Sequence, residues 1–265
     1  MEMIKGMPDA EYHDLKRLST SGIKKLLTSA QDFWTWSWFN VDKEPYESTS
    51  LNTGKAYHKY CLDGADAFHA AYAVAPECDK RTTAGKAIYA EWKAANPSAE
   101  AIDQRLLEQI TACNAANLFK DGEPEVTFLW NDAETNVPMK ARLDYLTGTH
   151  ILDLKTFSNS SDMDINRLIA NHIVKYKYHI QAAVYGSLFP DRTFRFVFQQ
   201  TGQANNCIVR DFPKDLLLYQ RGVDNMRQGI NKFAEMYRKF GDRPWFDDFG
   251  QDNFTDESFP IWSLE

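Results

Sequence analysis

Residues 141–157 read ARLDYLTGTHILDLKTF, and this stretch restricts the fold more than any other part of the sequence. Two short runs, in which apolar side chains alternate with others, flank a turn-like TGT, and this pattern predicts a β-hairpin. Each run carries one aspartate, Asp144 or Asp153, and Lys155 follows two residues after the second. Because alternate side chains of a strand share a face, Asp153 and Lys155 are expected on one face and the neighbouring leucines on the other.

This hairpin indicates metal-dependent chemistry. If the turn closes an antiparallel pair, Asp144 comes near Asp153, and two close carboxylates need a cation or a shared proton. Mg²⁺ is a natural compensating ion because it prefers carboxylate and water oxygens. Lys155 beside such an ion is suited to orienting a water nucleophile or stabilising charge on a phosphate, which suits phosphodiester hydrolysis. The alternative for an Asp–Lys pair at this spacing is a salt bridge at the rim of a sheet.

Acidic residues upstream of the hairpin add a third carboxylate. Glu125 opens the run EVTFLW, and a first strand of the same sheet would bring this side chain toward the aspartates. Glu123 is the competing candidate, although Pro124 favours a loop position for it. His58, in the helical segment GKAYHKYCL, is a further candidate, with an ordinary core or surface histidine as the alternative.

A helical stripe follows the hairpin. Tyr178, Gln181 and Tyr185 recur at i, i+3 and i+7, so they share one face of a helix. A glutamine flanked by tyrosines is suited to hydrogen-bonding a phosphate or a base edge, and the alternative is a half-buried helix face. We consider these three residues candidates for contact with DNA.

Composition places the chain among globular proteins. It has 265 residues, of which 43% are hydrophobic and 25% charged, enough for one sizeable core. We expect a single domain over 1–265, with a helical N-terminal part at about 1–120, a catalytic sheet core at about 121–212, and a C-terminal helix and tail at 213–265. No apolar run is long enough to cross a bilayer, and four scattered cysteines favour a reducing compartment, so we expect a cytoplasmic protein without membrane contact.

The order of the predicted elements indicates an α/β fold around a mixed sheet. Strands are expected at 125–131, 138–147, 151–157, 193–200 and 206–212. Helices are expected from the Ser19–Ser21 cap through the following GIKKLLTSAQDFWTWSWF, and at about 52–62, 63–100 with breaks at Pro76 and Pro97, 101–119, 165–189 and 214–240. The last 25 residues are acidic and aromatic, which suits packing across the body or contact with a partner.

These motifs resemble a known pattern. Asp144 followed after eight residues by Asp153-Leu154-Lys155 resembles the PD-(D/E)XK nuclease signature, with Leu143 in place of the proline. QAAVY at 181–185 resembles the QxxxY motif of the RecB-like branch, and GKAYH at 54–58 resembles its GxxxH helix. Together with MPDAEYHDLKRLSTSGIKKLL, PEVTFLW and ARLDYL in the same order, they are similar to RecE-type (exonuclease VIII-like) nuclease domains over about residues 7–190.

The resemblance implies a set of roles. Asp144 and Asp153 would be Mg²⁺ ligands, with Glu125 and His58 supporting the metal site. Lys155 would be the catalytic lysine. The resemblance also implies a restriction-endonuclease-like core, a mixed central sheet flanked by helices. Candidate DNA contacts are Gln181, Tyr185, Tyr178, Lys175 and Lys177.

The same resemblance implies an activity and partners. RecE-type enzymes use Mg²⁺, for which Mn²⁺ is expected to substitute, and degrade linear duplex DNA 5′→3′ to leave 3′ single-stranded tails. They act as ring-shaped homo-oligomers, commonly beside a single-strand-annealing recombinase. The net charge of −7 argues against a general polyanion binder, but a ring offers a basic channel within an acidic exterior. Candidate channel or groove residues are Lys24, Lys25, Lys175, Lys177, Arg192 and Arg195.

Two other hypotheses remain open from the sequence. One is a different PD-(D/E)XK DNA nuclease, either an endonuclease or a single-strand exonuclease. The other is a non-catalytic DNA-binding module that keeps the fold.

Overall fold

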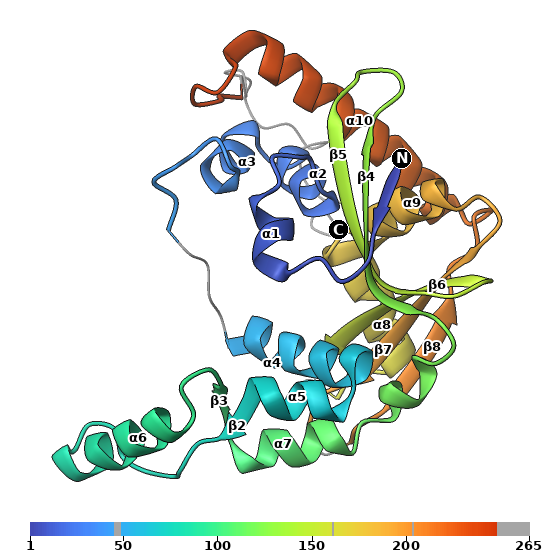
Figure 1. Cartoon of the computed structure of the whole chain (residues 1–265). Helices are drawn as coiled ribbons and strands as arrows, with labels where there is room; N and C mark the ends of the chain where they lie inside the picture. Colours follow the sequence, from blue (N-terminus) through green and yellow to red (C-terminus); the bar gives the residue numbers. More distant parts are fainter. Residues whose placement is uncertain (45–48, 161, 203, 248–265) are drawn as a thin grey trace, which may run out of the picture.

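A six-stranded mixed sheet forms the centre of the protein (Figure 1). The computed structural model describes residues 1–44, 49–160, 162–202 and 204–247. The strand order is β1-β4-β5-β6-β7-β8, and within this described sheet only the β6–β7 pair is parallel. The strands are β1 (Glu2–Ile4), β4 (Glu123–Asn131), β5 (Pro138–Leu146), β6 (His150–Phe157), β7 (Thr193–Gln200) and β8 (Cys207–Asp211). The fold is therefore the predicted α/β arrangement.

The connections explain this strand order. Short loops join β4, β5 and β6 into the predicted antiparallel meander. A parallel neighbour needs a longer crossover, and two helices supply it between β6 and β7, α8 (Ile165–Lys175) and α9 (Tyr178–Leu188). The crossover brings the predicted Tyr178–Tyr185 stripe to the sheet.

Two hydrophobic clusters cover the opposite faces of the sheet. Ile151 on β6 packs in the larger cluster with α9, α2 (Thr20–Leu26), α3 (Ala30–Trp36) and α10 (Leu217–Phe240). Leu152 and Leu154 pack in the smaller cluster on the other face, as the alternation predicts. In Figure 1, α10 runs behind the β4–β5 hairpin, and α4 (Thr49–His58), α5 (Ala65–Ala71) and α7 (Gln104–Thr111) lie on the other side of the sheet.

The remaining elements come from the N-terminal half. The helices are α1 (Asp9–Asp14), α4 (Thr49–His58), α5 (Ala65–Ala71), α6 (Thr83–Ala95) and α7 (Gln104–Thr111), with a π-helical turn η1 (Lys59–Asp63) and a 3₁₀ turn η2 (Asn114–Leu118). A small parallel sheet pairs β2 (Tyr72–Val74) with β3 (Glu100–Ile102). No helix of the described residues has the length and apolar character needed to span a bilayer.

Several predicted boundaries were wrong. The helix expected at 165–189 is two helices, because Lys177 adopts a left-handed φ of 52° between them. The segment after Ser19 is also two helices, and the second begins where the Ser29 hydroxyl accepts a hydrogen bond from the Asp32 amide. The helix expected at 101–119 shortens to α7 and η2, and the 63–100 segment contains β2. Strands of three residues, such as β1, are too short to show alternation.

The start of the C-terminal tail packs across the body. Trp245 is fully buried and stacks on Phe33 of α3, with ring centroids 5.1 Å apart. The carboxylate of Asp247 accepts hydrogen bonds from Ser29 and from the first amides of α3, and it pairs with Lys232 of α10. The rest of the acidic, aromatic tail lies outside the described residues.

Candidate active site

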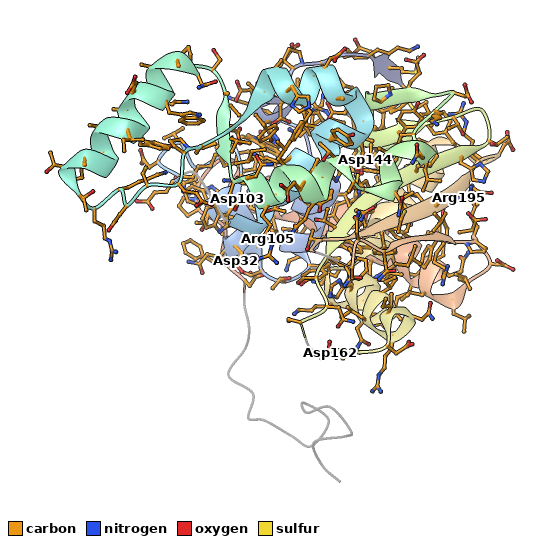
Figure 2. All side chains as sticks on the ribbon, turned by 90° about the horizontal axis from the view of Figure 1, so that it is seen from below. Asp32, Asp103, Arg105, Asp144, Asp162 and Arg195 are labelled. Atoms are coloured by element: carbon orange, nitrogen blue, oxygen red, sulfur yellow. The ribbon has the colours of Figure 1, made fainter. Side chains whose placement is uncertain are left out.

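Strands β5 and β6 separate at the two predicted aspartates. Only two residue pairs join these strands: Tyr145 pairs with Leu152, and Leu146 pairs with Ile151. Asp144 and Asp153 therefore occupy the first facing positions beyond the paired region. In the gap, the Leu154 amide donates a hydrogen bond to Oδ2 of Asp144 over 2.8 Å. The side chain of Asp144 therefore takes the place of a strand partner. Figure 2 shows Asp144 between the sheet and the helices of the N-terminal half.

His58 reaches the same point from α4. Its Nε2 lies 3.0 Å from the Leu154 carbonyl oxygen, and its Nδ1 lies 3.8 Å from Oδ2 of Asp144. The structure thus brings the predicted histidine and the first predicted aspartate together around one backbone residue. A ring nitrogen, a carboxylate and a carbonyl oxygen converge here.

Asp153 is fully buried beneath α9. The side-chain amide of Gln181 donates to its Oδ1 over 2.6 Å, and the Lys155 ammonium lies 2.6 Å from its Oδ2. Burial raises the pKa of Asp153 to about 6; Lys155 opposes this rise and the charge of Asp144 adds to it. The glutamine of the predicted stripe therefore supports the buried aspartate in this structure.

Lys155 joins the two carboxylates electrostatically. Burial alone lowers the pKa of Lys155, but the charges of Asp153 and Asp144 outweigh burial and hold the pKa above its ordinary value. The ammonium group is therefore charged at neutral pH. It also lies 5.2 Å from the ring centre of Tyr178, and the Lys24 ammonium lies at the same distance from that ring.

Glu125 lies on β4 at the edge of a cleft of about 560 Å³. The cleft is also lined by His58, Asp9 and Asp63. Burial raises the pKa of Glu125, and the charges of Asp63 and Asp144 raise it further, against the effect of Arg142. Two of the acids are already paired, Asp63 with Lys59 over 2.8 Å and Asp9 with Arg142 over 3.0 Å, so Glu125 is the acid of this group without an ion pair among the described residues.

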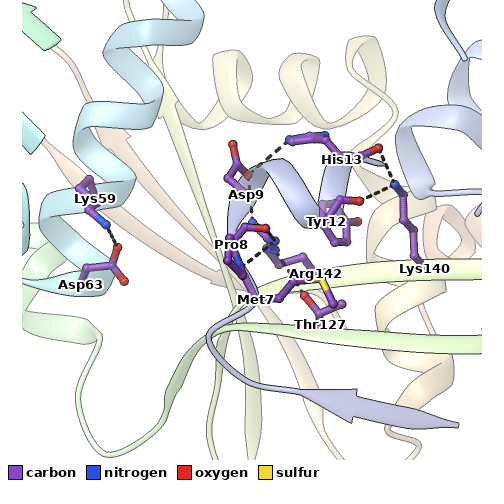
Figure 3. A network of polar contacts seen from close by, with 10 residues as sticks. All are labelled: Met7, Pro8, Asp9, Tyr12, His13, Lys59, Asp63, Thr127, Lys140 and Arg142. Carbon is purple, nitrogen blue, oxygen red and sulfur yellow. Dashed lines mark hydrogen bonds and ion pairs between the residues drawn. The ribbon is translucent and has the colours of Figure 1, made fainter. Parts of the chain in front are cut away.

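Arg142 secures the N-terminal segment beside this cleft (Figure 3). Its guanidinium donates to the carbonyl oxygens of Met7 and Pro8 and pairs with Asp9 over 3.0 Å. The same group lies 4.2 Å from the ring centre of Tyr12. Arg142 was not predicted as a separate site residue beyond its place in the ARLDYL run, because its partners lie about 130 residues earlier.

The other predicted DNA contacts have different surroundings. Tyr185 is buried, and its hydroxyl donates to the carbonyl oxygen of Arg142 over 2.8 Å. Lys175 and Lys177 lie at the α8–α9 corner, outside the cleft that Glu125 lines. Arg195 pairs with Asp211 on the far edge of the sheet. The DNA contacts of all these residues remain predictions.

The carboxylate oxygens of Asp144, Asp153 and Glu125 are ligands of the kind that a hard cation prefers, but they do not surround a common point. Within the described residues, no three His, Cys, Asp or Glu side chains converge closely enough to hold an ion. One observation nevertheless fits a cation: the charge of Asp144 acts on both Asp153 and Glu125 and raises the pKa of each. Carboxylates in this state are suited to accept a divalent ion.

The diverging hairpin, the buried Asp–Lys pair and the mixed sheet together define a PD-(D/E)XK-type nuclease fold. A family model described as "PDDEXK-like domain of unknown function (DUF3799)" matches residues 19–240, and the chain belongs to this family. It is thereby a member of the PD-(D/E)XK nuclease superfamily.

A solved structure shares this fold. The crystal structure of a protein from Eubacterium rectale, named "Putative exonuclease", aligns with a TM-score of 0.54 and 15% sequence identity, covering 98% of each chain. The crystal structure of SSO0001 aligns at 13% identity over 54% of this chain and 69% of that one, with a TM-score of 0.30, too low to carry an argument. No curated protein matches the sequence.

Proposed function

We propose that this protein is a Mg²⁺-dependent exodeoxyribonuclease that degrades linear duplex DNA 5′→3′ and leaves 3′ single-stranded tails. The observation that carries the proposal is the arrangement at the β5–β6 divergence, where Asp144, Asp153 and a charged Lys155 lie within electrostatic reach of one another. A buried acid–lysine pair at a splayed strand end is suited to phosphodiester chemistry.

The residues have separate roles in this proposal. Asp144 and Asp153 would hold the ion, with Glu125 and His58 beside them, and Mn²⁺ would substitute for Mg²⁺. When bound, the ion supplies an activated water and neutralises charge on the phosphate. Lys155 places a positive charge beside the phosphate oxygens, and Gln181 fixes the orientation of the Asp153 carboxylate.

The finer features of the proposal rest on the RecE-type resemblance. These are the 5′→3′ direction, a ring-shaped homo-oligomer around the DNA end, and a single-strand-annealing recombinase as partner. A ring accounts for DNA binding by a chain of net charge −7, because basic residues can face the channel while acidic ones face outward.

The test is digestion of linear duplex DNA labelled at either the 5′ or the 3′ end, with and without Mg²⁺. We expect Mg²⁺-dependent early loss of the 5′ label, and loss of activity in Lys155→Ala and Asp153→Asn. Lys86→Ala, a change at an exposed lysine of α6, is the matched control and should keep full activity. Activity in a folded Lys155→Ala protein that equals the native activity would refute the assignment.

Closed circular DNA separates the exonuclease from an endonuclease. An exonuclease leaves the circle intact, whereas cleavage of the circle would favour the endonuclease alternative. Calorimetry with Mn²⁺ and DNA addresses the non-catalytic alternative, which predicts DNA binding without metal binding.

A further inference from the structure

A second hollow, of about 400 Å³, lies between α2, α3 and the α8–α9 corner. Its polar lining includes Thr28, whose hydroxyl accepts a hydrogen bond from Lys177, and one acid, Asp32. We call it the lysine–aromatic groove, and its defining residues are Lys24, Lys25, Trp36, Lys175, Tyr176 and Lys177.

The groove carries unneutralised positive charge. Four lysines line it against the single carboxylate of Asp32, and within the described residues none of the four forms an ion pair. Lys24 is the most enclosed of them, and burial, followed by the nearby charge of Lys155, lowers the pKa of Lys24 to about 7. Lys24 is therefore only partly charged near pH 7, and the ammonium groups of Lys25, Lys175 and Lys177 make the groove complementary to a polyanion.

Two large aromatic rings are exposed among these charges. Trp36 is 40% exposed and Tyr176 is 44% exposed. The ammonium of Lys25 lies 5.1 Å from the Trp36 ring centre, and that of Lys175 lies 5.4 Å from the Tyr176 ring centre. Each ring is therefore paired with a cation, the combination by which proteins hold unpaired bases and their phosphates.

Tyr178 links residues of the groove to the catalytic lysine by ring contacts. The ring centres of Tyr176 and Tyr178 are 5.6 Å apart at an interplanar angle of 30°. Lys24 and Lys155 both lie over the Tyr178 ring, one from the groove and one from the catalytic pair. A strand whose phosphate lies at Lys155 would meet Tyr178 and then the groove.

We propose that the lysine–aromatic groove binds a single-stranded segment of DNA next to the phosphate to be cleaved. This rests on the proposed function and adds the form of its substrate: the DNA is unpaired where it leaves the catalytic lysine. Unpaired bases offer faces that can stack on Trp36 and Tyr176, whereas bases within a duplex are already stacked on their neighbours.

The first experiment measures binding without cleavage. Fluorescence anisotropy of a short fluorescein-labelled oligo(dT) and of a blunt duplex is recorded in EDTA. We expect Trp36→Ala and Tyr176→Ala each to weaken oligo(dT) binding about tenfold and to leave duplex binding within about twofold. Tyr89→Ala is the matched control, because Tyr89 has a similar cation contact, with Lys80 3.5 Å from its ring centre, on a helix, α6, that lies apart from α2 and α3 (Figure 1).

A conservative variant separates stacking from folding. Trp36→Phe keeps an aromatic face, so oligo(dT) affinity should be retained while the quenching of intrinsic fluorescence by oligo(dT) decreases. Equal weakening of both DNA forms by Trp36→Ala would overturn the proposal and leave a non-specific basic patch. Unchanged oligo(dT) binding in both alanine variants would overturn it as well.

The outcomes for the groove and for the nuclease are distinguishable. If linear duplex is digested but the alanine variants bind oligo(dT) as the native protein does, the groove proposal is wrong and the nuclease stands. If no DNA is digested in Mg²⁺ or Mn²⁺ while the native protein prefers oligo(dT), the nuclease is wrong and single-strand binding stands without it.

Discussion

Glu125 and Asp144 occupy facing positions of β4 and β5, at the one position within these two strands where their pairing is interrupted. The pairs on either side are Pro124–Tyr145 and Val126–Leu143, and Glu125 between them has a left-handed φ of 46°. Such a conformation costs on the order of 1 kcal/mol or more in a non-glycine residue, and it is found where surrounding structure enforces it. Here it directs a third carboxyl group to the edge of the cleft.

Replacing the Glu125 carboxyl with an amide should stabilise the protein. The pKa of Glu125 is raised in the folded state, so folded protein binds more protons than unfolded protein between the two pKa values, and stability falls as pH rises through that window. Glu125→Gln removes this loss, and we expect a higher Tm at neutral pH together with weaker nuclease activity. Glu123→Gln is the matched control, because Glu123 is half exposed and pairs with Lys5. A Tm equal to or below the native value would contradict the expectation.

Gln181→Ala should destabilise the fold. The change removes the hydrogen bond to Oδ1 of Asp153, a fully buried carboxylate, and leaves that oxygen without a donor. We expect the free energy of unfolding to decrease by about 1–3 kcal/mol. Urea denaturation measures this, with Gln228→Ala, an exposed glutamine of α10, as control. A change no larger than the control's would show that the bond adds nothing.

The Asp247 contact should make stability acid-sensitive. Burial raises the pKa of Asp247, but hydrogen bonds from Lys232, Ser29 and the α3 amides outweigh it and hold the pKa below its ordinary value. The stabilisation is therefore complete above the unfolded aspartate pKa of about 4 and is lost as pH falls through the folded value. The Tm difference between native protein and Asp247→Asn should be largest at neutral pH and shrink below about pH 4.

The control for that comparison is Asp224→Asn, at an exposed position of α10. Its Tm should follow the native curve at every pH. If the Tm difference between native protein and Asp247→Asn stayed constant as the pH falls below about 4, the substitution would destabilise the protein for steric reasons and not through loss of the carboxylate charge.

Arg142→Lys should release the N-terminal segment without unfolding the sheet. A lysine keeps the charge but lacks the planar fork that reaches Met7, Pro8 and Asp9 together. We expect faster hydrogen exchange over residues 7–14, little change in the strands, and reduced nuclease activity. Arg195→Lys, which alters the pair with Asp211 on the distant sheet edge, should leave this segment protected. Unchanged exchange in Arg142→Lys would refute the anchoring role.

The sequence predicted the parts of the fold that depend on local periodicity. Strands such as 151–157 and the helix ending at Phe240 came within a few residues of the structure, because alternation and amphipathic spacing extend over many residues. The break at Lys177 depends on one residue in a left-handed conformation, and no periodic pattern in the sequence predicts such a residue. The π-helical turn after His58 was missed for the same reason.

The site was predictable in its composition more than in its arrangement. Strand alternation placed Asp153 and Lys155 on one face, and the salt bridge between them follows from that. The hydrogen bond from the Leu154 amide to Asp144 requires the strands to separate, a feature of sheet twist that no residue pattern encodes. The role of Arg142 depends on a segment that the chain brings back from its beginning.

The capping of α3 by Asp247 has a consequence for synthesis of the protein. Helix α3 carries Trp36 on one wall of the lysine–aromatic groove, yet its first amides are satisfied by a side chain more than 200 residues later. A growing chain on the ribosome cannot complete this wall until Trp245 and Asp247 have emerged from the exit tunnel. The helix that forms this wall of the groove thus reaches its final support only after the six strands of the central sheet have been made.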